Sequence, residues 1–288
     1  MSDTSSDRWE SPIFVASLGR SGSTLLQRVL NVHPQVTIWG EHGGMLKGIT
    51  EACTALQHEA NTKNLESGRE LRDSVVGELT DKENFYPWVS PFTTSDVVGA
   101  FRATLLDLFT RGLSPEIRWG FKEIRYDEAV LRALMSLFPK AHLVMLARDL
   151  EGHVSSRFFA FGNRDYDFDS DEGRADAKKK VENMTEGWLR RYEGMLKIAE
   201  EMPERCSYVA YSDLVNGSER IPALFRELGE SVPDAASISE VLQAKAGSSF
   251  RHNSIARSNR ARLPEIFETA EFDRSRHAVI ASAFGLPS

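Results

Sequence analysis

The chain has 288 residues, which is long enough for one large domain or two small ones with a sizeable buried core. Hydrophobic residues make up 41% and charged residues 27%, and a net charge of −7 argues against general binding to nucleic acid or membrane surfaces. No apolar stretch approaches the roughly 18 residues of a membrane span, and the polar tail 1–10 carries no secretory signal. Cys53 and Cys206 are too few for a disulfide framework, so we expect a cytoplasmic protein.

A strand, a loop of small residues and a helix are predicted at 13–30. The apolar run 13–18 has the length of a strand, and the apolar residues between 25 and 30 share one helical face. This order turns a helix N-terminus and free backbone N–H groups toward an anion, although an ordinary turn with a serine cap would have a similar pattern. The residues predicted to face the anion are Arg20, Gly22, Ser23 and Thr24.

A second strand is predicted at 36–39, and it leads to Glu41 and His42 in a loop flanked by glycines. In a parallel sheet this loop would lie at the same carboxyl edge as the small-residue loop at 19–24, called the anion loop below. Open α/β sheets place their ligand sites at this edge. Residues 45–115 are mostly helical in pattern. They include an aromatic, proline-containing loop at 85–92, which either lines a substrate pocket or packs into the interior.

Strands and helices then alternate. Strands are predicted at 118–126 and 141–147, each followed by a helix, at 127–137 and 150–161. This alternation predicts a parallel sheet with helices on both faces. The strand at 141–147 ends in Arg148, a charged residue at the same predicted edge.

The last part of the chain is predicted to contain a solvated loop or mobile lid at 162–185, a helix at 188–202, a strand at 207–215 and a helix at 221–228. We find no internal repeat or linker, so a single domain over 1–288 is the simplest organisation. Between residues 240 and 265 there are cations but no carboxylate, which indicates an anionic ligand or a solvated basic loop. These cations are Lys245, Arg251, Arg257, Arg260 and Arg262.

Three of these segments together resemble the sulfotransferases that use 3′-phosphoadenosine 5′-phosphosulfate (PAPS). The loop 19–26 is similar to the family's 5′-phosphosulfate loop. The segment 148–156 resembles its 3′-phosphate element, in which an Arg and a Ser eight residues later bind the ribose 3′-phosphate. The segment 209–215 is similar to the family's valine-x-tyrosine-x-aspartate-leucine strand. The resemblance implies a three-layer α/β fold related to the P-loop nucleotide hydrolases, with PAPS as co-substrate and adenosine 3′,5′-bisphosphate (PAP) as product.

The resemblance also implies a catalytic base. Many cytosolic members carry Lys-x-His before the 3′-phosphate element, but the similar position here reads Lys122-Glu123-Ile124. The His-Pro at 33–34 followed by Gly-Glu at 40–41 fits the bacterial and protein-tyrosine branches, which use a Glu. We therefore expect Glu41 to be the general base, with His42 and Glu123 as the other candidates, or Glu41 to have a supporting role.

The same resemblance implies that Arg20 and Lys122 face the charge that builds on the bridging oxygen, although Lys122 could equally form an ion pair with a nearby carboxylate. No metal ligand set is implied. The residues expected to bind the nucleotide are Arg20, Ser21, Gly22, Ser23, Thr24, Leu25, Arg148, Ser156, Tyr211, Arg251 and Arg257.

The expected reaction is in-line transfer of a sulfuryl group from PAPS to a hydroxyl or amine. A P-loop nucleotide kinase is the first alternative, but it needs a Walker lysine, which does not follow Gly22. A catalytically silent PAPS- or PAP-binding module is the second. The acceptor is expected to be a small molecule, a glycan or a peptide, contacted by 42–95 and 158–185. Nucleic acid partners and membrane insertion are not expected, and a homodimer is left open.

Overall fold

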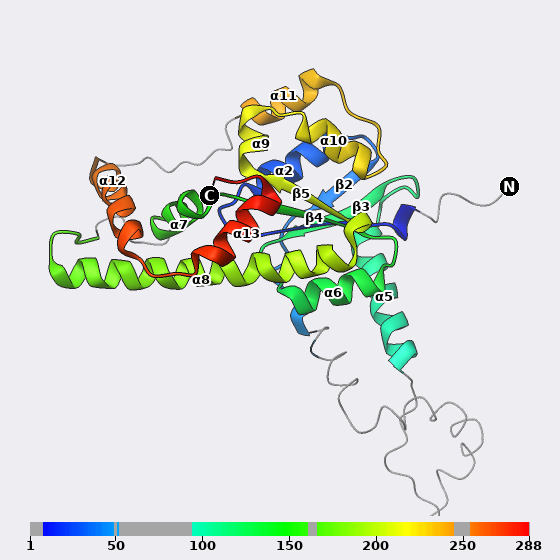
Figure 1. The fold of residues 1–288 in the computed structure, drawn as a ribbon. Coiled ribbons are helices and arrows are strands. Elements are labelled where there is room, and N and C mark those ends of the chain that lie inside the picture. Colours follow the sequence, from blue (N-terminus) through cyan, green and yellow to red (C-terminus); the bar gives the residue numbers. More distant parts are fainter. Residues whose placement is uncertain (1–7, 49–50, 52–93, 161–165, 245–253, 288) are drawn as a thin grey trace, which may run out of the picture.

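The computed structural model describes residues 8–48, 51, 94–160, 166–244 and 254–287 (Figure 1). Its centre is a five-stranded parallel sheet with the strand order β2-β3-β1-β4-β5. The strands are β1 Ile13–Ser17, β2 Val36–Trp39, β3 Arg118–Glu123, β4 His142–Ala147 and β5 Cys206–Ala210. Every residue of the three inner strands is buried, as expected for a parallel sheet covered on both faces.

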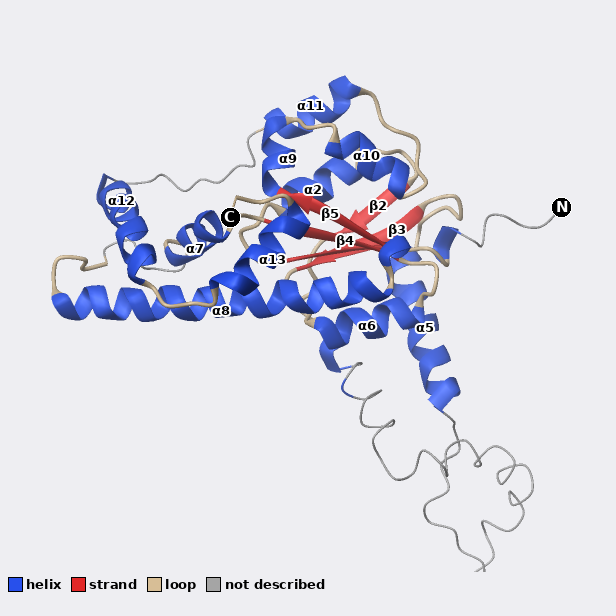
Figure 2. Cartoon of the chain, viewed as in Figure 1, coloured by secondary structure: helices blue, strands red, loops and turns tan. Residues whose placement is uncertain are grey.

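Helices cover both faces of the sheet, so the predicted three-layer α/β fold is confirmed (Figures 1 and 2). One face carries α2 Ser23–Leu30, α9 Tyr211–Asn216, α10 Arg220–Glu227 and α11 Ala235–Gln243. The other face carries α5 Thr94–Thr110, α6 Glu128–Leu137, α8 Asp171–Glu201 and α13 Arg274–Phe284. The first face is held by Leu26, Val29 and Leu30 of α2, on the helical stripe that the sequence predicts.

Helix α8 is much longer than predicted. It begins at Asp171, capped by the Ser170 side chain, so the prediction of a loop or lid over 162–185 was wrong from residue 171 onward. Its first half extends past the sheet, where α7 Leu150–Phe158 and α12 Ser254–Thr269 pack on it (Figure 2). Among the described residues, no helix is both long enough and apolar enough to cross a bilayer.

Three element ends also differ from the prediction. Strand β3 stops at Glu123, short of the predicted 126, and the N–H groups of the next two residues bond to the Glu123 carboxylate. Strand β5 stops at Ala210, and Tyr211 begins helix α9 instead of continuing a strand to 215. The cause is local, because the carboxylate of Asp213 accepts the N–H of Ala210 at 2.9 Å and thereby fixes the start of the helix. Helix α7 ends at Phe158, whose side chain is fully buried. The cysteine at 206 is a free thiol, whereas Cys53 lies outside the described residues.

Candidate active site

Four strands bring the predicted site residues to one edge of the sheet. The parallel register places Ser17 of β1 beside Leu146 of β4, and Trp39 of β2 beside Phe121 of β3. The loops that follow these strands therefore leave the sheet at a similar level, at its carboxyl edge. This shared edge is why residues far apart in the sequence meet in one place.

The loop between β1 and α2 has the geometry of an anion site. Arg20 and Gly22 both adopt positive φ, at 72° and 92°. The N–H groups of Leu25 and Leu26 are bonded to the Gly22 carbonyl, and no side chain caps the N-terminus of α2. The serine-capped turn is therefore not what forms here, and the first N–H groups of the helix remain available to an anion.

Glycine is needed at position 22 for two reasons: its backbone has a positive φ, and Tyr211 leaves no room for a Cβ. A Cβ at this position would lie 2.5 Å from a ring carbon of Tyr211, in addition to the cost of a left-handed conformation. We expect Gly22→Ala to lower the free energy of unfolding by about 1–3 kcal/mol and to weaken nucleotide binding. Chemical denaturation and calorimetry would measure the two effects.

The matched control is Gly217→Ala, since Gly217 also has positive φ, at 64°, but a Cβ there meets no atom within 4 Å. The stability loss of Gly217→Ala therefore measures the cost of the left-handed backbone alone, because the added Cβ collides with no other atom. If both variants lose the same stability and Gly22→Ala binds nucleotide normally, the close contact with Tyr211 has no role.

Ser21 points into the protein and not toward a ligand. Its side chain is fully buried, and its Oγ lies 3.3 Å from Nδ1 of His153 on α7. Burial lowers the pKa of His153 to about 3, and the neighbouring cations Arg157 and Arg148 act in the same direction. The anion loop therefore packs against the neutral side chain of His153. The side chain of Ser21 is turned inward, so only its backbone could contact a ligand.

Two of the three residues expected to act in catalysis, Glu41 and Lys122, are in direct contact. Nζ of the buried Lys122 contacts Oε1 of Glu41 and lies 3.3 Å from Oγ1 of Thr24, the second residue of α2. The ion pair that the sequence left open for Lys122 thus exists, and its partner is Glu41. This contact joins the end of β3, the loop after β2 and the anion loop.

Arg125 is a site residue that the sequence reasoning missed. Its Nη1 lies 2.9 Å from Oε2 of Glu41 and 2.9 Å from Oε1 of Glu123. Two cations therefore orient the Glu41 carboxylate, while 29% of this side chain stays exposed to a reactant. The charged run Lys122-Glu123-Ile124-Arg125 at the end of a strand was the available signal.

The Glu123 carboxylate supports the backbone of the site. Its Oε2 accepts the N–H groups of Gly44 (3.0 Å) and His42 (3.3 Å), and its Oε1 accepts those of Ile124 (2.9 Å) and Arg125 (3.2 Å). Burial would raise the pKa of Glu123, but these backbone donors and the Arg125 guanidinium bring it below its usual value. An ionised carboxylate with both oxygens occupied is a poor candidate for the base.

His42 is also held in place. Its Nε2 contacts the Tyr126 hydroxyl, and its ring packs edge-on against Phe121 with centroids 4.7 Å apart. Burial lowers its pKa, against the opposing effect of the nearby Glu123 carboxylate. Nδ1 of His42 is buried and has no hydrogen-bond partner within the described parts of the chain.

The segment 148–156, which resembles the family's 3′-phosphate element, lies against the anion loop. Nε of Arg20 is 3.4 Å from Oγ of Ser156, and Nη1 of Arg148 donates to the Arg20 carbonyl at 3.4 Å. The Arg148 guanidinium lies 4.7 Å over the ring of Tyr211, and its Nε is buried without a hydrogen-bond partner among the described residues. Arg20, Arg148, Ser156 and Tyr211 therefore form one cluster.

The basic segment near the C-terminus is only partly placed. Arg251 lies outside the described residues, and of Arg257 only the helical backbone in α12 is described. Arg262 pairs with Asp169, whereas Arg260 lies over the Phe159 ring. Burial lowers the pKa of Arg260, and the nearby cations Arg148 and Arg20 act in the same direction, so Arg260 is the cation of this segment that lies near the anion loop among the described residues. Within the described ranges, no group of His, Cys, Asp and Glu side chains is arranged to hold a metal ion.

The regions expected to contact the acceptor, 42–95 and 158–185, contain aromatic residues, only some of which the structure describes. Phe158 and Phe159 are buried in the core beside Phe168, so they serve packing. Tyr86, Trp88 and Phe161 lie outside the described residues, as does most of the expected acceptor region 42–95.

Comparisons with known proteins agree with this fold. The sulfotransferase domain of the olefin synthase of Synechococcus PCC 7002 is 18% identical, with a TM-score of 0.54, over 96% of this chain and 95% of that chain. The sulfotransferase domain of the curacin biosynthetic pathway is 17% identical, with a TM-score of 0.51, over 96% and 98%. No curated protein matches the chain by sequence.

A sequence model described as the sulfotransferase family matches residues 12–234, a range that contains the anion loop, Glu41, Lys122, the 3′-phosphate element and Tyr211. The match spans all five strands of the sheet. The chain therefore belongs to the sulfotransferase family.

Proposed function

We propose that the protein transfers the sulfuryl group of PAPS to a hydroxyl or amine acceptor, with Glu41 as general base. The observation that carries this proposal is the contact chain from Thr24 through Lys122 to Glu41. It places a carboxylate and a buried cation next to the loop that would hold the reacting end of the donor. These are the two groups that such a displacement needs beyond the binding of its reactants.

The donor is proposed to bind across the cluster at the carboxyl edge. The backbone N–H groups and hydroxyls at the start of α2 would hold the 5′-phosphosulfate. Arg148 and Ser156 would bind the ribose 3′-phosphate. The buried Nε of Arg148 supports this, because it has no hydrogen-bond partner among the described residues and its ion pair with Asp149 Oδ2 is long, at 3.9 Å. Arg20, whose Nε lies 3.4 Å from Oγ of Ser156, would lie between the two anionic groups.

The proposed chemistry is one in-line displacement. The acceptor oxygen or nitrogen forms a bond to sulfur while the bond from sulfur to the bridging oxygen of the phosphate breaks. The acceptor proton passes to a carboxylate oxygen of Glu41, and the electron pair of the broken bond leaves with PAP. Lys122 and Arg20 would stabilise the charge that grows on that bridging oxygen.

A thermal-shift series with PAPS, PAP, ATP and GTP, each with and without Mg²⁺, tests the donor assignment. We expect PAPS and PAP to raise the unfolding temperature without metal, because a ligand that binds only the folded state stabilises it. A shift confined to ATP or GTP with Mg²⁺ would favour the nucleotide kinase. Stabilisation by PAP without transfer of label from PAPS to any acceptor would favour the silent binding module.

A further inference from the structure

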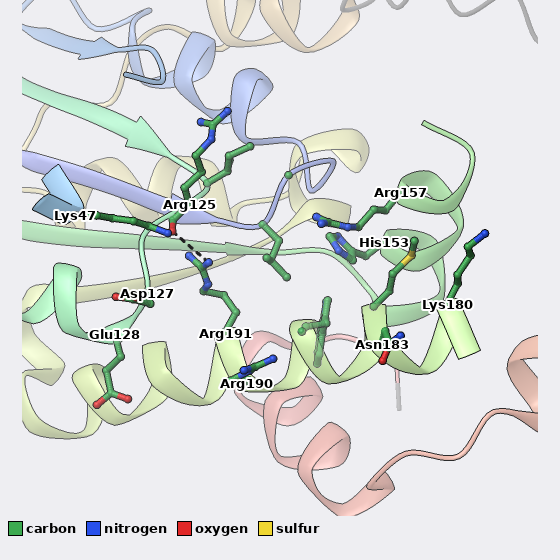
Figure 3. A pocket seen from close by; sticks show the side chains of 16 residues that line it. Lys47, Arg125, Asp127, Glu128, His153, Arg157, Lys180, Asn183, Arg190 and Arg191 are labelled. Carbon is green, nitrogen blue, oxygen red and sulfur yellow. Dashed lines mark hydrogen bonds between the residues drawn. The ribbon is translucent and has the colours of Figure 1, made fainter. Parts of the chain in front are cut away.

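A large pocket adjoins the anion loop on the face of the sheet that α8 covers. Its volume is about 900 Å³, which is in the range of pockets that hold small organic molecules. Its lining comes from Leu18 and Gly19 of the anion loop, from the end of β3 at Ile124 and Arg125, and from α7 and α8 (Figure 3). The pocket therefore borders the place where the donor's sulfuryl group would lie. Arg125 joins it to Glu41, because the same side chain lines the pocket and holds that carboxylate.

The lining is strongly basic. Its only two acids, within the described residues, are already engaged: Asp127 caps α6 by accepting the N–H of Val130, and Glu128 pairs with Arg132. Because the whole chain is acidic, this concentration of positive charge is local. The cations in the lining are Lys47, Arg125, Arg157, Lys180, Arg190 and Arg191.

Arg191 is the clearest sign of a missing anion. Figure 3 shows its side chain extending from α8 toward Arg125, whose carbonyl accepts a hydrogen bond from Nη2 at 3.4 Å. Its Nη1 is buried and has no hydrogen-bond partner in the part of the chain that the structure describes. Burial lowers the pKa of this guanidinium, and the Asp127 carboxylate opposes that effect without forming an ion pair with it. A buried cation with an unused donor is costly unless a ligand pairs with it.

Arg157 supplies a second cation on another wall of the pocket. It extends from α7 beside His153 and, among the described residues, forms no ion pair or hydrogen bond (Figure 3). Lys180 and Arg125, by contrast, are engaged with Asp176 and with Glu41 and Glu123. Arg157, Arg191 and the exposed Arg190 are thus the guanidinium groups of the lining with donors to spare among the described residues. Guanidinium favours the planar oxygens of carboxylate and phosphate.

From these contacts we infer that the acceptor is an anionic small molecule, which carries a carboxylate or phosphate group that Arg191 and Arg157 bind while its hydroxyl or amine faces the anion loop. This inference rests on the proposed sulfuryl transfer and adds the charge class of the acceptor to it. A neutral acceptor would leave the buried Nη1 of Arg191 without a hydrogen-bond partner among the described residues. An acceptor of this kind binds through its charge and reacts through a separate group.

The test is a panel of hydroxyl compounds in which each member is offered as a carboxylate, as a phosphate ester and as the neutral methyl ester. Labelled PAPS reports turnover, and calorimetry on the PAP-saturated protein reports binding. We expect an anionic member to exceed its neutral partner in kcat/KM or affinity by about 10- to 100-fold, the effect of one charge-assisted hydrogen bond. Comparison of the carboxylate and phosphate members of the panel shows which of the two groups the protein prefers.

Arg191→Gln and Arg157→Gln are each expected to reduce this preference without changing the affinity for PAP. Arg157 is exposed, so its variant stays informative if loss of the buried Arg191 prevents folding. Lys179→Gln is the matched control, because Lys179 is an exposed cation of α8 outside the pocket lining, and its loss is expected to change nothing.

The inference fails if neutral members are preferred, if no anionic member is sulfated or bound, or if the arginine variants weaken PAP binding instead. Failure of the wild-type protein to bind PAP would refute the proposed function itself. PAP binding is measured in the absence of any acceptor, so this failure is distinguishable from failure of the acceptor inference.

Discussion

Glu41→Gln is expected to lower turnover by about 10²–10⁴-fold, the usual contribution of a positioned general base. The glutamine keeps the size of the side chain and still offers an oxygen to Lys122 and Arg125, but it cannot take a proton from the acceptor. Binding of PAP is expected to change little, because Glu41 faces the acceptor side of the proposed donor site. Initial rates with labelled PAPS and calorimetry with PAP measure the two quantities.

The other base candidates provide the comparison. Glu123→Gln is expected to lower stability, since the Glu123 carboxylate accepts four backbone N–H groups of the loops around the site. His42→Asn keeps a polar side chain and leaves Glu41 in place. If Glu41→Gln retains near-normal turnover while His42→Asn loses it, His42 is the base and the assignment of Glu41 is wrong.

Arg148→Ala is expected to weaken PAP binding by about 1.5–3 kcal/mol for each charge-assisted hydrogen bond that is lost, or roughly 10- to 150-fold for a single bond. In the structure, Nε of Arg148 is buried without a hydrogen-bond partner among the described residues, and the guanidinium lies over the ring of Tyr211. This preset orientation means that little side-chain freedom is lost when a phosphate binds. Calorimetry with PAP measures the loss.

Adenosine 5′-monophosphate serves as the ligand control, because it lacks the 3′-phosphate. Its affinity is expected to be nearly the same for the wild type and for Arg148→Ala. Arg226→Ala, at an exposed arginine in the last turn of α10, controls for the change of net charge. Unchanged PAP affinity in Arg148→Ala, or an equal loss for both nucleotides, would show that the 3′-phosphate binds elsewhere.

The sheet, and the meeting at one edge of the residues expected to bind the donor, could be predicted because their signals are local. The strands are short apolar runs that end in glycine or charge, and the loop at 19–24 follows one of them directly. Parallel strands bring their carboxyl ends together, so the order of the predicted strands is enough to assign Arg148 and Glu41 to one edge.

The first half of α8 was not predictable in the same way. Its buried residues there, Ala177 and Val181, are few, and much of the rest is charged. The helix is supported by pairs four residues apart, such as Lys178 with Glu182 and Lys180 with Asp176, and such pairs also occur in solvated loops. Its packing against α7 and α12 is a tertiary effect that the local sequence does not contain.

The pocket cations were missed for a related reason. Arg191 lies within an ordinary helical pattern, and only the fold brings it next to Arg125, 66 positions away in the sequence. A charge on a helix is usually solvated, and its burial could not be foreseen. Arg125 had a weak signal at the end of a strand, but its link to Glu41 depends on the pairing of β2 with β3.

The ring of Tyr211 has a consequence for the way the two ends of the donor are recognised. One part of the ring would collide with any side chain at Gly22, and the Arg148 guanidinium lies over the same ring. In the proposed binding mode, a single rigid aromatic side chain therefore acts as the spacer between the 5′ and 3′ anion sites, and it sets the length of nucleotide that fits. The losses of PAP binding free energy caused by substitutions at Gly22 and Arg148 are consequently not expected to be additive. Each substitution would shift the Tyr211 ring, which the other residue also contacts.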